Sequence, residues 1–185
     1  MTSLRKAGVV VRTAALAAVC CAALLSQQAA LAEDGDTKAL LDALGKTRQS
    51  LVAGMRQASI GSAVPISAKF EMEDGKLSLS VYTAGKGVAV PAEKNVLQEL
   101  SGSPEDGKWA PKAEVFADVP HVARSAEQLA IVALGKTSLV AAIGQARKNQ
   151  TGTVFSVTPA IRNHQPVAVI LFADKGKVRK VIQPL

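Results

Sequence analysis

The sequence predicts an α+β protein made of two similar repeats, each a broken or continuous helix followed by an antiparallel three-stranded sheet. Three observations support this: apolar residues recur at helical spacing, alternating segments follow them, and the whole pattern occurs twice. The segment Ser50–Ala53, read as SLVA, returns as Ser138–Ala141, an offset of 88 residues. Because a repeat of this kind is one supersecondary unit, we expect two units of the same design. Their sheets could join in one.

The two predicted helical segments carry the same apolar stripe. Its positions step by three, four or seven residues, which is the spacing of one helical face. At offset 88 the stripe pairs Leu41 with Leu129, Leu44 with Val132, Met55 with Ile143 and, among the charged positions, Arg48 with Lys136. Gly45 and Gly135 lie just before Ser50 and Ser138, which can cap the start of a new helix. Each segment is therefore either a broken helix or a continuous one in which Arg48 and Lys136 extend past the core.

A pair of strands is predicted after the first helical segment. Apolar and polar residues alternate here, as in half-buried antiparallel strands. The apolar members are Ile66, Ala68, Phe70 and Met72 in one strand, and Leu77, Leu79 and Val81 in the next. Asp74-Gly75 between them is a hairpin signal.

The second strand pair follows the same plan. Phe155, Val157 and Ile161 alternate with polar residues, and Arg162–Gln165 is the predicted turn. The next strand, residues 167–172, is apolar almost throughout, which favours a central place in the sheet. Pro159 indicates a sheet edge or a bulge in the strand that contains it.

A third strand should end each repeat. We expect it at Val178–Ile182 in the second repeat, straight after a turn at Lys175-Gly176, and at Val88–Val90 in the first. Residues 91–109 are rich in Gly, Pro, Ser and charge and read as an insertion, after which Ala113–Phe116 resumes a short strand. The repeats are assigned to residues 33–118 and 119–185, with a joint at Asp118–His121 and the second helix starting at Ser125.

Residues 1–32 read as a cleaved signal peptide, with an uncleaved N-terminal anchor or a lipoprotein signal as the alternatives. A basic start is followed by an apolar stretch from Ala14 to Leu25 and by an A-x-A cleavage site that ends at Ala32. We therefore expect an exported protein, periplasmic or secreted, with no transmembrane segment after cleavage. Both cysteines, Cys20 and Cys21, would leave with the signal. No disulfide or thiol chemistry is then expected.

Charge is distributed unevenly along the chain. Residues 33–118 hold 10 basic and 13 acidic residues, whereas residues 119–185 hold 9 basic and 2 acidic ones. The densest basic run is Lys175, Lys177, Arg179 and Lys180. It is a candidate site for an anion or an acidic partner. The alternative is an edge strand whose lysines guard it against aggregation. Aromatic residues are only 3% of the chain, and no nucleic-acid partner is expected.

The pentapeptide ALGKT occurs twice, at Ala43–Thr47 and Ala133–Thr137, and resembles the end of a phosphate-binding loop. Such a loop needs a further glycine five residues before its last one, between a strand and a helix. Leu40 and Ala130 occupy those positions. A nucleotide site is therefore not predicted. The two copies lie 90 residues apart and are thus out of step with the 88-residue repeat.

Little else in the sequence points to chemistry. His121 and His164 are the only histidines, too few for a dedicated zinc site. Glu71 and Glu73 share one strand face and are candidate groups for calcium or acid–base work, or else a solvated face. Trp109, the only tryptophan, is expected to cover the core. No catalytic motif is recognised, so we predict no enzyme activity and no cofactor.

Several segments together resemble the PepSY family over about residues 38–181. They are KTSLVAAIGQA (136–146), FSVTP (155–159), PVAVIL (166–171) and KGK (175–177), with PISAKFE (65–71) and DGKLSLSVY (74–82) upstream. The resemblance implies two small α+β modules with a noncatalytic role, either protease inhibition or binding in the cell envelope. The implied partner is an envelope protease or another protein. The alternative is an envelope protein that binds a metal or a small anion. The chain departs from the family in its insertion and in lacking a clear D-x-x-T-G turn.

Overall fold

This computed structural model describes residues 34–104 and 108–185 of the chain. These residues form four α-helices, one short 3-10 helix and seven β-strands. The α+β class is thus confirmed. The predicted signal peptide, residues 1–32, lies outside the described residues, as do residues 105–107 of the predicted insertion.

The elements run in a helix–helix–strand order that occurs twice along the chain. The first series is α1 (Asp34–Leu44), α2 (Leu51–Ala58), β1 (Val64–Glu73), β2 (Lys76–Ala84), η1 (Ala92–Lys94), β3 (Leu97–Gly102) and β4 (Lys112–Val115). The second is α3 (Val119–Leu134), α4 (Leu139–Ala146), β5 (Thr153–Arg162), β6 (Gln165–Asp174) and β7 (Lys177–Pro184).

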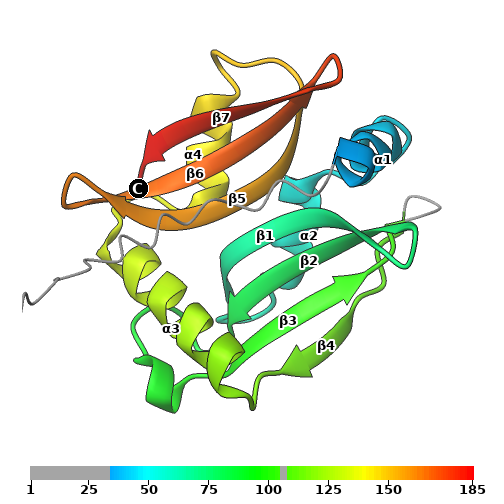
Figure 1. Ribbon diagram of the computed structural model, residues 1–185. Helices are drawn as coiled ribbons and strands as arrows, with labels where there is room; N and C mark the ends of the chain where they lie inside the picture. Colours follow the sequence, from blue (N-terminus) through cyan, green and yellow to red (C-terminus); the bar gives the residue numbers. More distant parts are fainter. Residues whose placement is uncertain (1–33, 105–107) are drawn as a thin grey trace, which may run out of the picture. The chain divides into compact units, whose positions relative to one another are not determined.

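All seven strands belong to one antiparallel sheet, in the order β4-β3-β2-β1-β5-β6-β7 (Figure 1). The sequence left open whether the two repeats share a sheet, and in the structure they do. The two series meet where β1 pairs with β5, and the pairing is short: Ala68 lies opposite Val157 and Lys69 opposite Ser156. β6 is central, as its continuous apolar run predicts, because it pairs with β5 on one side and β7 on the other.

Of the two alternatives for each helical segment, the structure shows the broken one. Ser50 caps α2, with its Oγ accepting a hydrogen bond from the N–H of Ala53 at 3.1 Å. Ser138 caps α4 in the same way, through the N–H of Ala141 at 3.2 Å. In both places a serine hydroxyl satisfies an N–H group that has no partner within the helix, so the second helix starts cleanly.

The hairpin turns are also confirmed. Asp74-Gly75, Asn163-His164 and Lys175-Gly176 each have positive φ at both residues, with values from 48° to 74°. Two-residue turns of this hand match the twist of the flanking strands. They set the registers that pair Glu73 with Lys76 and Arg162 with Gln165.

Two predicted boundaries are wrong. α3 begins at Val119 rather than at Ser125, because Asp118 accepts a hydrogen bond from the N–H of His121 and Pro120 suits the first helical turn. Val88–Val90 forms turns and no strand, and the third strand is β3, inside the predicted insertion. The side chain of Asn95 holds this loop together, since its amide donates to the carbonyls of Gly87 and Val90. The short strand after the insertion is confirmed as β4.

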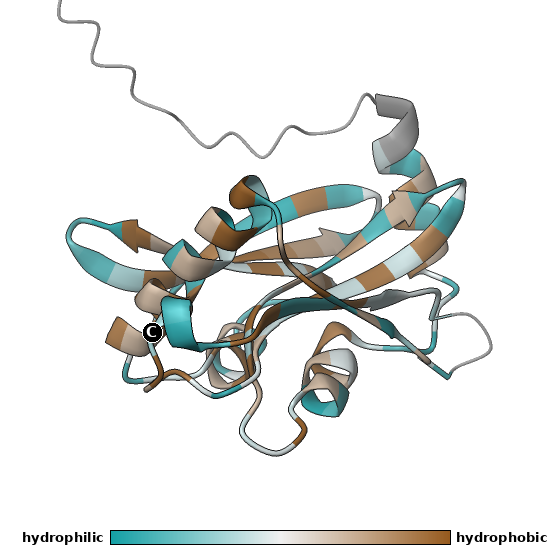
Figure 2. Cartoon of the chain, turned by 90° about the horizontal axis from the view of Figure 1, so that it is seen from below, coloured by the Kyte–Doolittle hydropathy of each residue, from teal (hydrophilic) through white to brown (hydrophobic). Residues whose placement is uncertain are grey.

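The sheet has an inner face that packs on helices α2 and α4. Ala68, Phe70, Ile170 and Phe172 on this face are buried, and a Cβ added to Gly54 of α2 would lie 2.4 Å from Leu79. Figure 2 shows the alternation of apolar and polar residues along the strands that this packing requires.

The outer face is the opposite side of the sheet. α3 crosses part of it, where Ser67 donates a hydrogen bond to Gln128 at 2.8 Å and both side chains are buried (Figure 1). The rest of the outer face on β1 and β2 includes Lys69, Glu71 and Glu73. The buried apolar residues of both series form one core, which includes Trp109 at 3% exposure.

Candidate functional site

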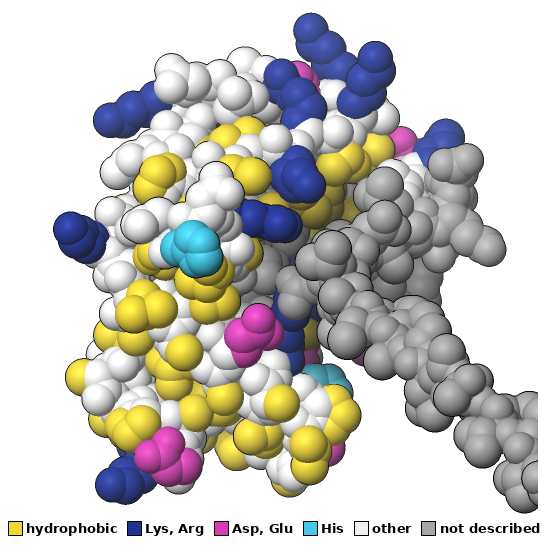
Figure 3. All heavy atoms as spheres, turned by 60° about the vertical axis from the view of Figure 1, so that its left-hand side comes forward, with side chains coloured by type: hydrophobic (Ala, Val, Ile, Leu, Met, Phe, Trp, Pro, Cys, Tyr) yellow, Lys and Arg dark blue, Asp and Glu magenta, His cyan; other side chains and the backbone are white. Residues whose placement is uncertain are grey.

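The predicted basic run lies at β7, the outermost strand on its side of the sheet. Lys175 is in the turn before β7, and Lys177 and Arg179 point to the inner-face side, as their spacing requires. Lys180 points to the outer-face side, opposite Leu171. The structure therefore spreads these four cations over a turn and two faces. Figure 3 shows Lys and Arg side chains gathered at the top of that view.

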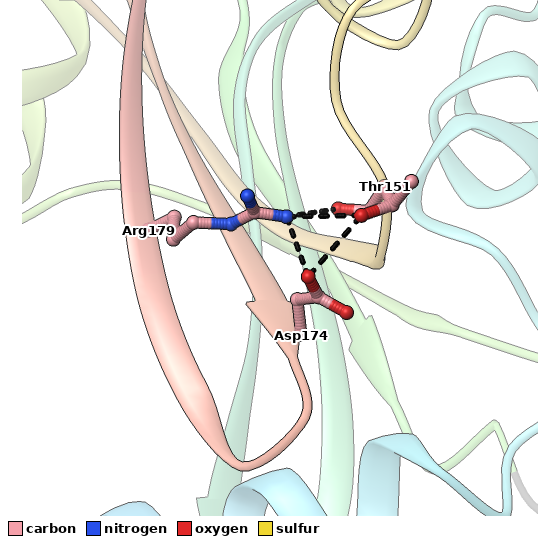
Figure 4. Close-up of polar contacts among 3 residues, drawn as sticks. All are labelled: Thr151, Asp174 and Arg179. Carbon is pink, nitrogen blue, oxygen red and sulfur yellow. Dashed lines mark hydrogen bonds and ion pairs between the residues drawn. The ribbon is translucent and has the colours of Figure 1, made fainter.

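Arg179 forms hydrogen bonds to Asp174 and Thr151 (Figure 4). Its Nη2 donates to Asp174 Oδ2 at 2.6 Å and to the backbone oxygen of Thr151 at 3.1 Å. The Thr151 hydroxyl donates to the same carboxylate oxygen at 3.2 Å. A guanidinium suits this role because each terminal nitrogen carries two N–H groups, so Nη2 alone can donate to both Asp174 and Thr151. Arg179 thus joins β7 to the loop before β5.

The three lysines differ from Arg179. Lys175, Lys177 and Lys180 are exposed, and within residues 34–104 and 108–185 none has an ion-pair partner. Their charges are thus open to solvent or to a partner.

Among the described residues, β7 has a strand neighbour on one side only, which is β6. The N–H of Leu185 donates to the carbonyl of Pro166 at 3.0 Å, and the register pairs Val167 with Pro184. In an antiparallel ladder alternate residues bond to the neighbouring strand, so the N–H and C=O groups of Val178, Lys180 and Ile182 point away from β6. We call these three residues the β7 edge. Pro184 belongs to the same alternate set of residues that face away from β6. A proline is tolerated there because it has no N–H to donate to a neighbouring strand.

Glu71 and Glu73 lie on the outer face, as predicted. Both carboxylate oxygens of Glu71 have a partner. Lys69 Nζ lies 2.5 Å from one of them, and Ser80 Oγ donates a hydrogen bond to the other at 3.2 Å. Glu73 is exposed beside the hairpin turn. Among the described residues no group of three or more His, Cys, Asp or Glu side chains could hold a metal ion.

Tyr82 lies on the same outer face of β2. Burial raises the pKa of its hydroxyl well above the ordinary value, and the nearby carboxylates of Glu99, Glu71 and Glu73 raise it further. Its ring stacks on Phe116, with centroids 6.0 Å apart, and Phe116 stacks on His121 at 5.1 Å. This keeps Tyr82 neutral and makes it part of the packing between β2 and the start of α3.

The two histidines lie in different surroundings. His121 Nδ1 lies 2.8 Å from Asp118, whose pKa is lowered chiefly by the hydrogen bond from the backbone N–H of His121 and next by the His121 side chain. His164 lies in the β5–β6 turn with φ of 61°. Trp109 covers the core as predicted, and its indole N–H donates to the carbonyl of Gly102 at 3.2 Å.

The first ALGKT segment forms the end of α1. The N–H groups of Lys46 and Thr47 both donate to the carbonyl of Ala43, and that of Gly45 donates to Leu41. A phosphate-binding loop needs these amides free to point at phosphate oxygens. The segment therefore cannot act as such a loop in this conformation.

A pocket that the sequence did not reveal lies between the α1–α2 connection and the β1–β2 hairpin. Its volume is about 870 Å³. Its lining comprises Ala39, Asp42, Ala43, Lys46, Thr47, Arg48, Met72, Gly75, Lys76, Leu77 and Pro104. In the sequence, only the neighbouring charges of Lys46 and Arg48 hint at this pocket. Lys76 lines it too but is distant from them in the chain.

Comparisons with family models, with curated proteins and with solved structures found no match for this chain. In the part of the chain that the structure describes, no single helix is long and apolar enough to cross a bilayer. Taken together, α3 and α4 reach that length and hydropathy, but they are bent by 69° at their junction.

Proposed function

We propose that this chain is an exported, nonenzymatic binding module of the PepSY type that regulates or inhibits a protease in the cell envelope by pairing with an extended segment of it. The β7 edge is the observation that carries this proposal. An exposed edge strand offers main-chain donors and acceptors to an added strand, while alternate side chains choose the partner.

The repeated order of elements supports the PepSY layout. Each series begins with a broken helix whose second part is capped by a serine, at Ser50 and at Ser138, and continues with three consecutive antiparallel strands. β4 is additional to this layout. β4 covers the edge of β3, so β7 is the strand of the three-stranded layout that ends the sheet, with β4 as the other edge.

The side chains of the β7 edge favour a partner with acidic and apolar residues. Ile182 is 51% exposed and Lys180 is exposed, and both point to the outer-face side of the sheet. Self-association through this edge is disfavoured, because a second β7 would bring further lysines toward Lys177 and Lys180. An extended acidic segment would neutralise them instead.

The proposal predicts that Ile182→Pro blocks the partner without unfolding the protein. The N–H of residue 182 points outward, so proline removes a donor that an added strand needs and leaves the bonds to β6 intact. Ile182→Thr is the matched control, since it keeps the N–H and the strand preference. Tagged protein is used to capture partners from the envelope fraction, and the affinity of the recovered protease is then measured. We expect about tenfold weaker binding for Ile182→Pro, as loss of about 1.4 kcal/mol implies.

The test has one folding control and two outcomes that would contradict the proposal. Far-UV circular dichroism must show that both variants remain folded. Unchanged affinity of folded Ile182→Pro would show that the β7 edge is not the contact. If no partner is captured under any growth condition, the function itself is refuted.

A further inference from the structure

We infer that the pocket between the α1–α2 connection and the β1–β2 hairpin binds an amphiphilic organic anion, with a phosphate or carboxylate head and an apolar body. This inference is independent of the β7 edge and concerns a different part of the molecule. It rests on three cations that line the pocket, on apolar lining residues and on a suitable volume.

The cations come from two separate segments of the chain. Lys46 and Arg48 follow α1, and Lys76 begins β2. None of the three has an ion-pair partner within the described residues. The pocket's carboxylate, Asp42, is held by Lys38 at 2.7 Å. The lining therefore carries a surplus of positive charge, which an anionic head would neutralise.

Part of the pocket lining is apolar. Met72 and Leu77 contribute to it from the sheet and Ala43 from α1. Leu77 is 6% exposed, and Met72 and Ala43 are half-buried. Small-molecule sites in proteins typically have about 300–1,000 Å³, an apolar lining and a few convergent polar groups. A volume of about 870 Å³ lies within that range.

The second half of the chain lacks this arrangement at the corresponding positions. At the repeat offset of 88, Lys46 corresponds to Leu134 and Arg48 to Lys136, and at 89 Lys76 corresponds to Gln165. One cation remains where the first half has three. The cluster is thus a property of the first half and not of the shared design, and it provides a matched control position in Lys136.

The test is calorimetric titration of the purified protein with octyl phosphate and with octanoate, each below its micelle concentration. Octyl glucoside has the same apolar body without the charge, and inorganic phosphate has the charge without the apolar body. We expect octyl phosphate or octanoate to bind at least tenfold more tightly than either control ligand. The two anions together show whether phosphate or carboxylate is the preferred head.

Variants then locate the site. Arg48→Gln and the double variant Lys46→Gln/Lys76→Gln should each weaken binding about tenfold or more, as expected for lost charge-assisted hydrogen bonds. Lys136→Gln should bind like the unaltered protein. Equal binding of octyl glucoside, equal losses in Lys136→Gln and Arg48→Gln, or no binding of either anion would each overturn the inference.

Discussion

Tyr82 is the residue whose ionisation the fold controls most strongly. Burial and the carboxylates of Glu99, Glu71 and Glu73 all disfavour the tyrosinate, so its pKa in the folded chain lies well above the ordinary value. The unfolded chain should titrate near the ordinary pKa of about 10. Below that pH both states hold the proton and the contribution to stability is complete. Above it the unfolded state loses the proton first, so stability falls as pH rises toward the folded pKa.

We therefore predict that Tyr82→Phe reduces the loss of stability at alkaline pH. The measurement is the denaturation midpoint from about pH 8 to about pH 11, with the unaltered protein compared at each pH. Tyr82 is the only tyrosine, so the near-ultraviolet absorbance of tyrosinate reports its titration alone. An ordinary tyrosine titration in the folded protein, or the same alkaline loss in Tyr82→Phe, would contradict the prediction.

Residue types were easier to predict than their partners. The run from Lys175 to Lys180 could be recognised by composition, and its location beside an edge strand was one of the two alternatives. The tie from Arg179 to Thr151 could not be foreseen, because these residues are 28 positions apart and meet only when β7 has paired with β6. The same holds for Lys76 beside Lys46 and Arg48.

At the scale of elements, α2 packs closely on β2 at Gly54. A Cβ on Gly54 would lie 2.4 Å from Leu79 Cδ2, and Leu79 is fully buried. Gly144 in α4 has nothing within 4 Å of its added Cβ. The two glycines are both interior to eight-residue helices and so differ chiefly in what surrounds them.

We predict opposite effects of alanine at these two positions. Gly54→Ala should lower the free energy of unfolding by up to about 2 kcal/mol, since overpacking costs about 1–3 kcal/mol and exceeds the gain in helix propensity. Gly144→Ala should raise it by about 0.5–1 kcal/mol, because that gain acts alone. Denaturant unfolding followed by far-UV circular dichroism measures both. Shifts of the same sign and size would show that α2 does not pack this closely.

Elements with strong local signals were predicted well. The serine caps and the turns at Asp74-Gly75 and Lys175-Gly176 depend on neighbouring residues only, and all are confirmed. Ser125 has the residue type of a helix start, which favours a later start for α3, whereas Asp118 and Pro120 start the helix earlier. The strand β3 was missed because its alternation is weak and its partner β2 defines it.

At the scale of the whole molecule, one sheet and one core join the two series of elements. Met55 of α2 and Ile143 of α4 are both fully buried in that core. They correspond at the repeat offset of 88 and lie over the same inner face. The shared core implies that neither series unfolds alone.

We therefore predict a single unfolding transition that substitutions in either series shift as a whole. Met55→Ala and Ile143→Ala should each cost about 2–5 kcal/mol. Fluorescence of Trp109, the only tryptophan, reports the first series, and far-UV circular dichroism reports both. The two signals should move together in both variants. A Trp109 transition that stays in place in Ile143→Ala would show that the series unfold independently.

By itself the sequence determined the class of fold, the serines that could cap a second helix, the hairpin turns and the strands with clear alternation. These depend on periodicity and on turn chemistry, which act over a few residues. Only the tertiary structure decided that seven strands form one sheet, that β7 is left as an edge, that Arg179 is tied to Asp174 and that Lys46, Arg48 and Lys76 line one pocket. Each of these requires contacts between segments distant in the chain. Such contacts depend on how buried faces fit together, which local patterns do not specify.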